Sequence, residues 1–127
     1  MPTVLIGDDE QHIRLLIEQA LEDLEDEGVE LQTASDGEMA LDVVTNQRPE
    51  LVFLDVMMPK KNGFEVCRAI KHDLGLAGTT VVMLTAKGQA YDREQGLAAG
   101  ADRYLTKPFD PDELVEIARA ALGLGAA

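Results

Sequence analysis

Cysteine and aromatic residues are scarce in this chain. Its 127 residues include one cysteine, Cys67, and aromatic side chains make up 4% of the total. A single cysteine excludes an internal disulfide and any metal site built from several cysteines, and it is typical of a reducing compartment. We expect Cys67 to be a small buried apolar residue. The core must be built from aliphatic side chains, and the apolar fraction of 46% supplies them.

Basic residues are also few. Acidic residues outnumber Lys and Arg by 24 to 11, and the formal net charge is -13 at pH 7. Such a chain repels phosphate backbones and anionic lipid, so we expect no direct nucleic-acid partner and no membrane partner. The excess lies in residues 1–50, with 14 acids and 2 bases. A solvated helix surface around residues 18–27 is the favoured explanation, and a docking surface for a basic partner is the alternative.

Long apolar runs are absent. No stretch of 18 consecutive apolar residues occurs, and residues 1–6 contain no basic side chain, so neither a transmembrane helix nor a signal peptide is predicted. We therefore expect a cytoplasmic protein. The length fits a single domain over residues 1–127, with no output domain in this chain.

Apolar periodicity predicts alternating strands and helices. Short apolar runs at 3–7, 51–55 and 80–85 suit strands buried on both faces of a parallel sheet, whereas the mixed segments 29–34 and 102–106 suit sheet edges. The helices expected between them are 13–24, the segment from Gly37 to Arg48, the segment from Gly63 to near Gly75, about 89–99, and the segment that starts at Asp110-Pro111.

This alternation predicts an α/β fold. With apolar strands at the centre and mixed strands at the edges, the simplest arrangement is a flavodoxin-like, doubly wound, five-stranded parallel sheet of order 2-1-3-4-5. Five helices then cover its two faces. The helix at about 89–99 has the weakest apolar stripe, because its inward register includes Arg93 and Glu94. We expect this helix to be loosely held.

Polar residues follow the strands that flank the reversal of strand order, where ligands bind in such sheets. They are Asp8, Asp9 and Glu10 after the first strand, Asp55 at the end of the third, Thr85 at the end of the fourth, and Lys107 after the fifth. Each residue alone is explained by a helix cap, a strand end or a surface position. Their joint placement at one edge of the sheet predicts a site.

Clustered carboxylates require a cation. Two carboxylates about 4 Å apart repel by roughly 4 kcal/mol at an effective dielectric constant near 20, and Lys107 alone cannot compensate three of them. The available ligands are hard oxygens, which favours Mg²⁺, or Mn²⁺, over zinc. Asp8 and Asp9 are the candidate metal ligands, and the backbone carbonyl of Met57 is a candidate to complete the shell. Mg²⁺ also takes phosphate oxygens, so a phosphoryl group fits this site.

Asp55 is then the candidate nucleophile, since an ionised carboxylate can attack a phosphoryl group and form an acyl phosphate. The Thr85 hydroxyl and the Lys107 ammonium are placed to contact the phosphoryl oxygens as their charge develops.

Four motifs resemble the receiver domains of two-component response regulators. They are Asp8-Asp9-Glu10, Asp55-Val56-Met57-Met58-Pro59 followed by Gly63, Leu84-Thr85-Ala86, and the segment from Gly100 to Phe109 that reads GADRYLTKPF. The motifs occur in the family's order and the resemblance covers essentially the whole chain. It implies a signalling switch that is not an enzyme beyond catalysing its own Mg-dependent phosphorylation and dephosphorylation.

The resemblance also implies roles for individual residues. Asp55 is the phosphoacceptor and takes its phosphoryl group from a phosphohistidine on a sensor histidine kinase or a histidine phosphotransfer protein. Asp8 and Asp9 are the acidic pair that binds Mg²⁺, with Asp55 and the Met57 carbonyl as further ligands.

The remaining matches concern switching. Thr85 corresponds to the family's switch hydroxyl, Tyr104 to its switch aromatic and Lys107 to its lysine, and Lys107-Pro108 matches the position of a cis peptide. Phosphorylation adds about -1.5 to -2 charges. We expect it to change the surface formed by the fourth helix, the fifth strand and the last helix, which binds a downstream protein.

Two departures concern oligomeric state. Arg103 and Ile117 replace charged residues through which many DNA-binding relatives dimerise, so the expectation is a monomer or weak dimer.

Three alternatives are disfavoured by single features. A phosphatase of the haloacid-dehalogenase type needs Asp-x-Asp at the nucleophile, and Met57 occupies the second position. A flavodoxin-like FMN carrier needs a phosphate-binding loop after the first strand, where Asp8-Asp9-Glu10 repels phosphate. A receiver-like scaffold that works without phosphorylation is expected to have lost one of the acidic pair, Thr85 or Lys107, and all are present.

Overall fold

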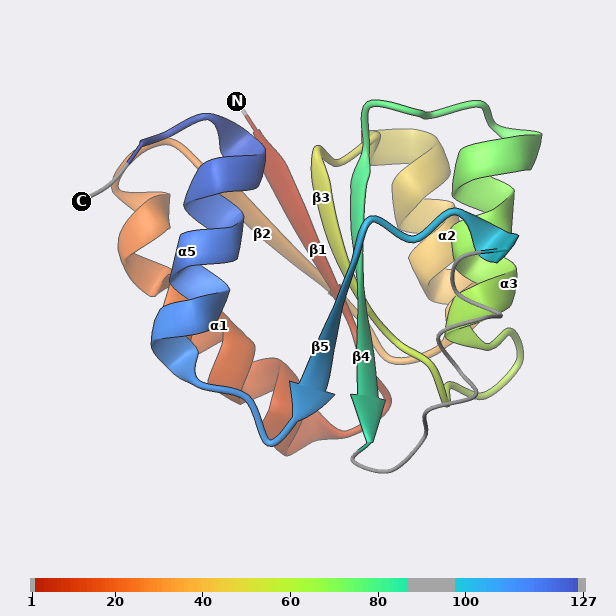
Figure 1. Cartoon of the computed structure of the whole chain (residues 1–127), viewed down its shortest axis with the longest axis horizontal. Coiled ribbons are helices and arrows are strands. Elements are labelled where there is room, and N and C mark those ends of the chain that lie inside the picture. The colour runs from red at the N-terminus through yellow and green to blue at the C-terminus, as the bar shows by residue number, and fades with distance from the viewer. Residues whose placement is uncertain (1, 87–97, 126–127) are drawn as a thin grey trace.

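A five-stranded, all-parallel sheet runs through the centre of the computed structural model, which describes residues 2–86 and 98–125 (Figure 1). The strands are β1 (Thr3–Gly7), β2 (Glu30–Ala34), β3 (Leu51–Asp55), β4 (Thr80–Ala86) and β5 (Arg103–Lys107). Their order is β2-β1-β3-β4-β5, so the predicted strand order is confirmed.

Helices cover both faces of this sheet. They are α1 (Gln11–Glu25), α2 (Gly37–Gln47), α3 (Gly63–Arg68) continued by the π-helical turn η1 (Ala69–Asp73), and α5 (Pro111–Leu122). Figure 1 shows α1 and α5 side by side on one face, and α2 and α3 on the other. The predicted helix at about 89–99 lies outside the described residues, except that Ala98 and Ala99 are helical.

Side-chain caps fix where three helices begin. The Asp36 carboxylate accepts a hydrogen bond from the Met39 N–H at 2.8 Å at the start of α2. Asn62 and Glu65 form a reciprocal capping box at the start of α3. Asp110 caps α5, with Pro111 in its first turn, as the sequence predicted.

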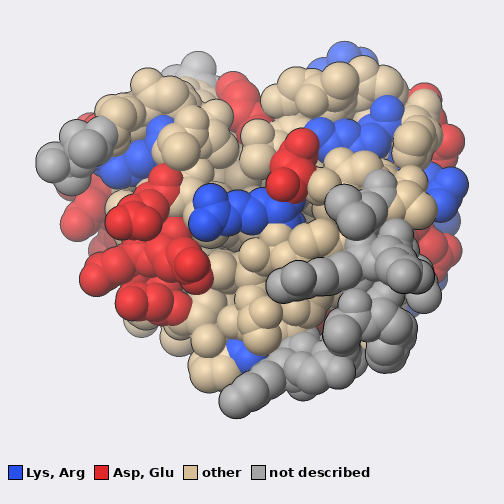
Figure 2. Space-filling view, viewed as in Figure 1, with Lys and Arg blue, Asp and Glu red and all other residues tan. Residues whose placement is uncertain are grey.

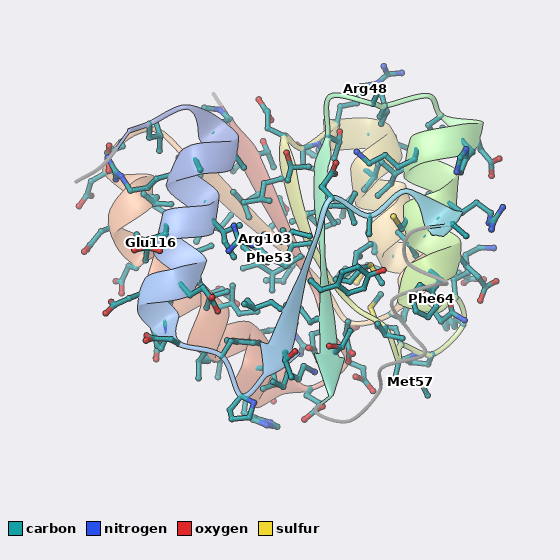
Figure 3. The ribbon with its side chains drawn as sticks, viewed as in Figure 1. Arg48, Phe53, Met57, Phe64, Arg103 and Glu116 are labelled. Carbon is teal, nitrogen blue, oxygen red and sulfur yellow. The ribbon has the colours of Figure 1, made fainter. Side chains whose placement is uncertain are left out.

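Burial follows the predicted pattern of central and edge strands. Every residue of β1 and β3 is buried, whereas the edge strands β2 and β5 are mixed. Two apolar clusters fill the spaces between sheet and helices: Phe53 lies in the cluster under α1 and α5 (Figure 3), and Cys67 in the cluster under α2 and α3. Cys67 is fully buried, as predicted, and burial raises the pKa of its thiol to about 11.

The acidic excess lies on the surface. Figure 2 shows acidic side chains gathered on the side of the molecule formed by α1 and α5. From Glu22 to Glu27, every acidic residue is exposed, as both a solvated helix surface and a docking surface require. The side chain of Arg119 on α5 binds Glu27 through two nitrogens, at 2.6 and 3.2 Å. In the part of the chain that the structure describes, no helix is both long and apolar enough to cross a membrane.

Candidate functional site

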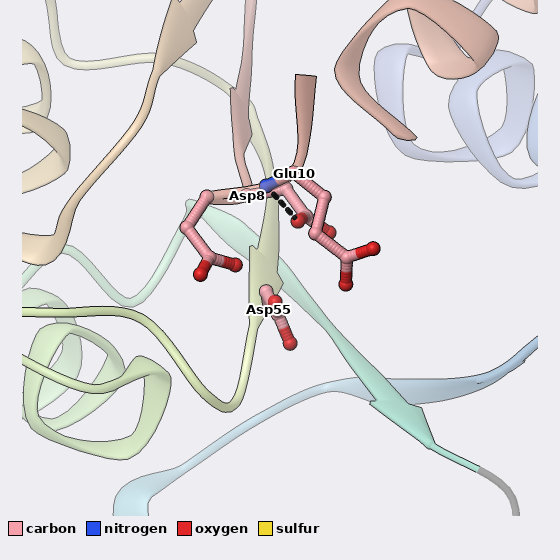
Figure 4. Close-up of side chains that lie close together, drawn as sticks. Asp8, Glu10 and Asp55 are labelled. Atoms are coloured by element: carbon pink, nitrogen blue, oxygen red, sulfur yellow. Dashed lines mark hydrogen bonds between the residues drawn. The ribbon is translucent and has the colours of Figure 1, made fainter. Parts of the chain in front are cut away.

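The carboxyl ends of β1 and β3 bring four carboxylates together. Gly7 pairs with Leu54 across the two strands, so the next residues, Asp8 and Asp55, leave the sheet side by side. One carboxylate oxygen from each of Asp8, Asp9, Glu10 and Asp55 lies within 4.8 Å of those of the other three. We call these four residues the acidic cluster. Figure 4 shows the side chains of Asp8, Glu10 and Asp55 lying close together at this edge.

Lys107 reaches the acidic cluster from the end of β5. Its Nζ lies 2.9 Å from Asp8 Oδ2, 3.4 Å from Asp55 Oδ2 and 3.6 Å from Glu10 Oε1. The peptide bond between Lys107 and Pro108 is cis, at the position that the family resemblance implied. The predicted convergence of the three aspartates and Lys107 is therefore present in the structure.

Thr85 is the next-to-last residue of β4 and lies at the same edge. Leu84 pairs with Asp55, so Thr85 lies one residue beyond the aspartate on the neighbouring strand, and it is buried. Tyr104 lies on β5, half-buried, and packs against the apolar cluster under α2 and α3. Thr85 thus lies at the predicted edge, and Tyr104 shares a strand with Lys107.

Burial strengthens the repulsion among the carboxylates of the acidic cluster. Asp8 is 0% and Asp55 5% exposed. Burial and the nearby charge of Asp8 raise the pKa of Asp55 to about 7, although Lys107 and the Met57 N–H oppose this shift. Burial alone would lower the pKa of Lys107, but its hydrogen bond to Asp8 and the surrounding carboxylates outweigh burial and raise it. The cluster therefore has more negative charge than one ammonium compensates.

Backbone groups orient two of the carboxylates. The Glu10 N–H donates to Asp8 Oδ1 at 2.9 Å, drawn as the dashed line in Figure 4, and the Met57 N–H donates to Asp55 Oδ1 at 3.2 Å. Arg14 donates to the backbone carbonyl of Asp8 at 2.7 Å and so anchors the turn itself. The Glu10 and Met57 bonds each fix one carboxylate oxygen, and the second oxygen of each carboxylate lies near Lys107 Nζ.

The second oxygen of Asp8 is suited to a cation. Oδ2 is buried, and its partner among the described residues is the Lys107 ammonium at 2.9 Å. Lys107 is shared with Asp55 and Glu10, so a further cation would lower the cost of burying this charge. The donor set consists of hard carboxylate oxygens, which suits a divalent ion such as Mg²⁺.

The structure adds one residue, Glu10, to the carboxylates that the sequence assigned to a metal ion. Glu10, which the sequence placed at the strand exit without a metal-binding role, joins the cluster, and its side chain makes no cap hydrogen bond at the start of α1. The sequence signal for this was its place as the third consecutive acid in Asp8-Asp9-Glu10. Met57 is 66% exposed and projects outward from the loop after β3 (Figure 3). Its role as a carbonyl ligand stays a prediction.

Acidic residues and one lysine lie together where the strand order of this flavodoxin-like sheet reverses. This combination is typical of phosphoacceptor signalling domains. Residues 4–119 match the family described as "Response regulator receiver domain", and the chain belongs to that family.

Several curated proteins are similar to this chain over nearly its whole length. It is 45% identical to "Probable transcriptional regulator ycf27" of Guillardia theta, covering 94% of this chain and 44% of that protein. It is 43% identical to "DNA-binding dual master transcriptional regulator RpaA" of Synechocystis sp., covering 96% of this chain and 49% of that protein. For "Phosphate regulon transcriptional regulatory protein PhoB" of Pseudomonas aeruginosa, the identity is 42%, covering 94% and 51%. The chain spans about half the length of these relatives.

Solved structures agree in fold. A structure titled as chemotaxis response regulator CheY4 of Vibrio cholerae superposes with a TM-score of 0.83 at 33% identity, covering 95% of this chain and 98% of that one. A putative response regulator from Chloroflexus aurantiacus gives a TM-score of 0.84 at 34% identity, covering 97% and 99%. These neighbours match at full length, which supports the fold class predicted from the sequence.

Proposed function

We propose that Asp55 is the phosphoacceptor of this receiver domain and that its donor is a phosphohistidine on a sensor histidine kinase or a histidine phosphotransfer protein. An Asp55 carboxylate oxygen forms a bond to phosphorus, the phosphorus–nitrogen bond breaks, and the released imidazole takes up a proton. The observation that carries this proposal is the placement of one ammonium, Lys107 Nζ, between Asp8 Oδ2 and Asp55 Oδ2 at 2.9 and 3.4 Å.

Asp8, Asp9 and Asp55 would hold the metal ion, Mg²⁺ or Mn²⁺, with the Met57 carbonyl as a further ligand. The buried Oδ2 of Asp8 and the all-oxygen donor set support this assignment. When bound, the ion supplies positive charge to the carboxylates and to the oxygens of the transferring phosphoryl group. Glu10, whose side chain is 47% exposed, lies at the rim of the cluster.

Lys107 and Thr85 stabilise the phosphoryl group once it is attached. The ammonium exchanges part of its contact with Asp55 for a phosphoryl oxygen, and the Thr85 hydroxyl donates to another. Thr85 lies near the end of β4 and Lys107 ends β5, so their movement is transmitted to Tyr104 and to the surface of β5 and α5. We propose that this surface, together with the segment before β5, binds the downstream protein.

Charge limits the choice of partner. Some relatives are named as DNA-binding or transcriptional regulators. A formal net charge of -13 disfavours nucleic acid as a direct partner of this domain, so the partner we propose is a protein. We also propose that the protein is cytoplasmic and that it is a monomer or weak dimer.

The test is phosphorylation by a small donor, acetyl phosphate, with Mg²⁺, followed by intact-mass measurement. We expect the mass gain of one phosphoryl group, stable in acid and labile in base. EDTA should prevent it and Asp55→Asn should abolish it. Asp42→Asn, which changes an exposed aspartate on α2, is the matched control and should be phosphorylated like the parent. An adduct that persists in Asp55→Asn, or one that forms in EDTA, overturns the assignment.

A further inference from the structure

Gly37, the first residue of α2, is enclosed so tightly that only glycine fits. A methyl group on its Cα would overlap the backbone carbonyl oxygen of Lys61 and lie 2.5 Å from the Lys61 Cβ. The Gly37 N–H also donates to the Pro59 carbonyl at 3.2 Å. Its φ is not in the left-handed region, so space, rather than backbone conformation, requires glycine here.

Pro59 and Lys61 belong to the loop that follows Asp55, residues 56–62, which we call the phosphoacceptor loop. The two ends of this loop are anchored near β3 and α3. The Met57 N–H binds the Asp55 carboxylate, and the Gly63 N–H donates to the Val56 carbonyl at 2.9 Å. Its middle meets the rest of the molecule at the start of α2.

Charged side chains link the same two segments. Lys60 Nζ lies 3.7 Å from Asp36 Oδ2 and 4.0 Å from Glu38 Oε2, on the two sides of Gly37. Lys60 is exposed, so these pairs contribute little energy. They mark where the loop lies against α2, and the Gly37 backbone sets how close the two segments come.

We propose that Gly37 is a positioning residue for the metal and phosphoacceptor site, and this inference rests on the proposed function. Steric contact with the start of α2 limits how closely Pro59 and Lys61 can approach it. Through them it sets the place of the Met57 carbonyl relative to Asp55.

The steric contact explains why a change at this position would reach the site. The atom that a side chain at residue 37 would meet first is backbone, so no rotamer change relieves the overlap and the loop itself must move. Pro59 is two residues from Met57, whose N–H already makes a long hydrogen bond, 3.2 Å, to Asp55. Displacing the loop therefore disturbs both the carbonyl ligand and the orientation of the Asp55 carboxylate.

The test compares Gly37→Ala with Gly78→Ala. Gly78 is the matched control, because a methyl group there meets nothing within 4 Å and its φ is not positive. Mn²⁺ binding is measured without a phosphoryl donor, from the electron paramagnetic resonance signal of free Mn²⁺. We expect Gly37→Ala to weaken Mn²⁺ affinity by about tenfold, as loss of an outer positioning contact does at other metal sites. Gly78→Ala should bind like the parent, and equal affinities for Gly37→Ala and the parent overturn the inference.

A measurement on the parent covers the case in which Gly37→Ala does not fold. Saturating Mg²⁺ should slow hydrogen exchange of the Gly37 N–H, because that group binds the loop that the metal orders. The Gly78 N–H should exchange at an unchanged rate. If Mg²⁺ shifts the amide resonances of Asp8 and Asp9 while Gly37 exchange stays the same, the positioning role is wrong but the metal site stands. If the parent binds neither ion, both the metal site and this inference fail.

Discussion

The ammonium of Lys107 lies 2.9 Å from Oδ2 of Asp8, a carboxylate with no exposure to solvent. The same nitrogen lies within 4 Å of Asp55 and Glu10, so one cation serves three carboxylates. Among the residues that the structure describes, no second Lys or Arg side chain forms an ion pair with the acidic cluster. The metal-free domain therefore carries an electrostatic strain that substitutions and pH can reveal.

Lys107→Met should destabilise the metal-free protein. Removing the cation leaves Asp8 and Asp55 buried without their partner, and we expect the free energy of unfolding in EDTA at pH 8 to fall by about 2–4 kcal/mol. Urea denaturation measures this change. Saturating Mg²⁺ should restore most of the loss, because the ion then neutralises the carboxylates. Lys60→Met, which removes an exposed lysine, is the control. Equal stability of Lys107→Met and the parent would contradict the role assigned to this ammonium.

Asp55→Asn should stabilise the metal-free protein at alkaline pH. The pKa of Asp55 is raised from 3.8 to about 7 in the folded state, so between these values the folded protein holds a proton that the unfolded chain has released. The stability of the parent consequently falls as pH rises from about 4 to about 7, a change that Asn lacks. We expect an advantage of about 1–3 kcal/mol at pH 8, because part of the gain is lost with the Lys107 ion pair.

Urea denaturation in EDTA at several pH values measures this difference. The advantage of Asp55→Asn should be small near pH 4, grow through neutral pH and level off above it. Asp42→Asn, an exposed change on α2, should show no such trend. A difference between Asp55→Asn and the parent that is constant with pH would show that Asp55 does not titrate differently in the folded state.

Much of this fold follows from local sequence. The apolar runs at 51–55 and 80–85 can be satisfied only by strands buried on both faces, and β3 and β4 are the buried centre of the sheet. Because parallel strands share a carboxyl edge, the residues that follow them must meet there. The convergence of Asp8, Asp55 and Lys107 was predictable for this reason.

Other features depend on contacts between distant segments. The overlap that requires glycine at position 37 involves Lys61, and neither residue's neighbours in sequence indicate it. The π-helical turn Ala69–Asp73 has the same apolar pattern as an α-helix, but the Leu74 N–H donates to the Ala69 carbonyl five residues back. Periodicity cannot separate these two hydrogen-bond registers, so the sequence predicted a plain helix to near Gly75.

Lys71→Met should lower stability without affecting the metal site. The Lys71 side chain on η1 is 10% exposed, and its Nζ lies 2.8 Å from Asp102 Oδ2, which also accepts the Val81 N–H. This pair ties η1 to the starts of β4 and β5, at the end of the sheet opposite the acidic cluster. We expect the free energy of unfolding to fall by about 1–3 kcal/mol.

The measurements for Lys71→Met are urea denaturation and Mg²⁺ titration by calorimetry. Mg²⁺ affinity should equal that of the parent. Arg68→Met, one turn earlier on α3 and exposed, should leave stability nearly unchanged. A weakened Mg²⁺ affinity in Lys71→Met would show that this end of the sheet is coupled to the acidic cluster.

The carboxylates of the acidic cluster should contribute unequally to metal binding. Asp8 is fully buried and shares its one cation, Lys107, with two other carboxylates, so a bound divalent ion offsets more of the cost of burying its charge. The Glu10 side chain is 47% exposed and its Oε2 lies 3.3 Å from His12, so water and the imidazole already solvate it. We expect Asp8→Asn to weaken Mg²⁺ affinity by about tenfold or more and Glu10→Gln by about threefold or less.

Calorimetric Mg²⁺ titration of the two variants separates a buried ligand from a carboxylate at the rim. Both substitutions remove one negative charge from the acidic cluster, so an effect of net charge alone would weaken binding equally in the two proteins. Unequal losses, with Asp8→Asn the larger, therefore agree with an ion bound on the buried side of the cluster, next to Asp8. Equal losses, or a larger loss in Glu10→Gln, would place the ion outside the cluster's buried side. A larger loss in Glu10→Gln would also favour Glu10, the acid without an assigned metal role in the sequence, as a ligand.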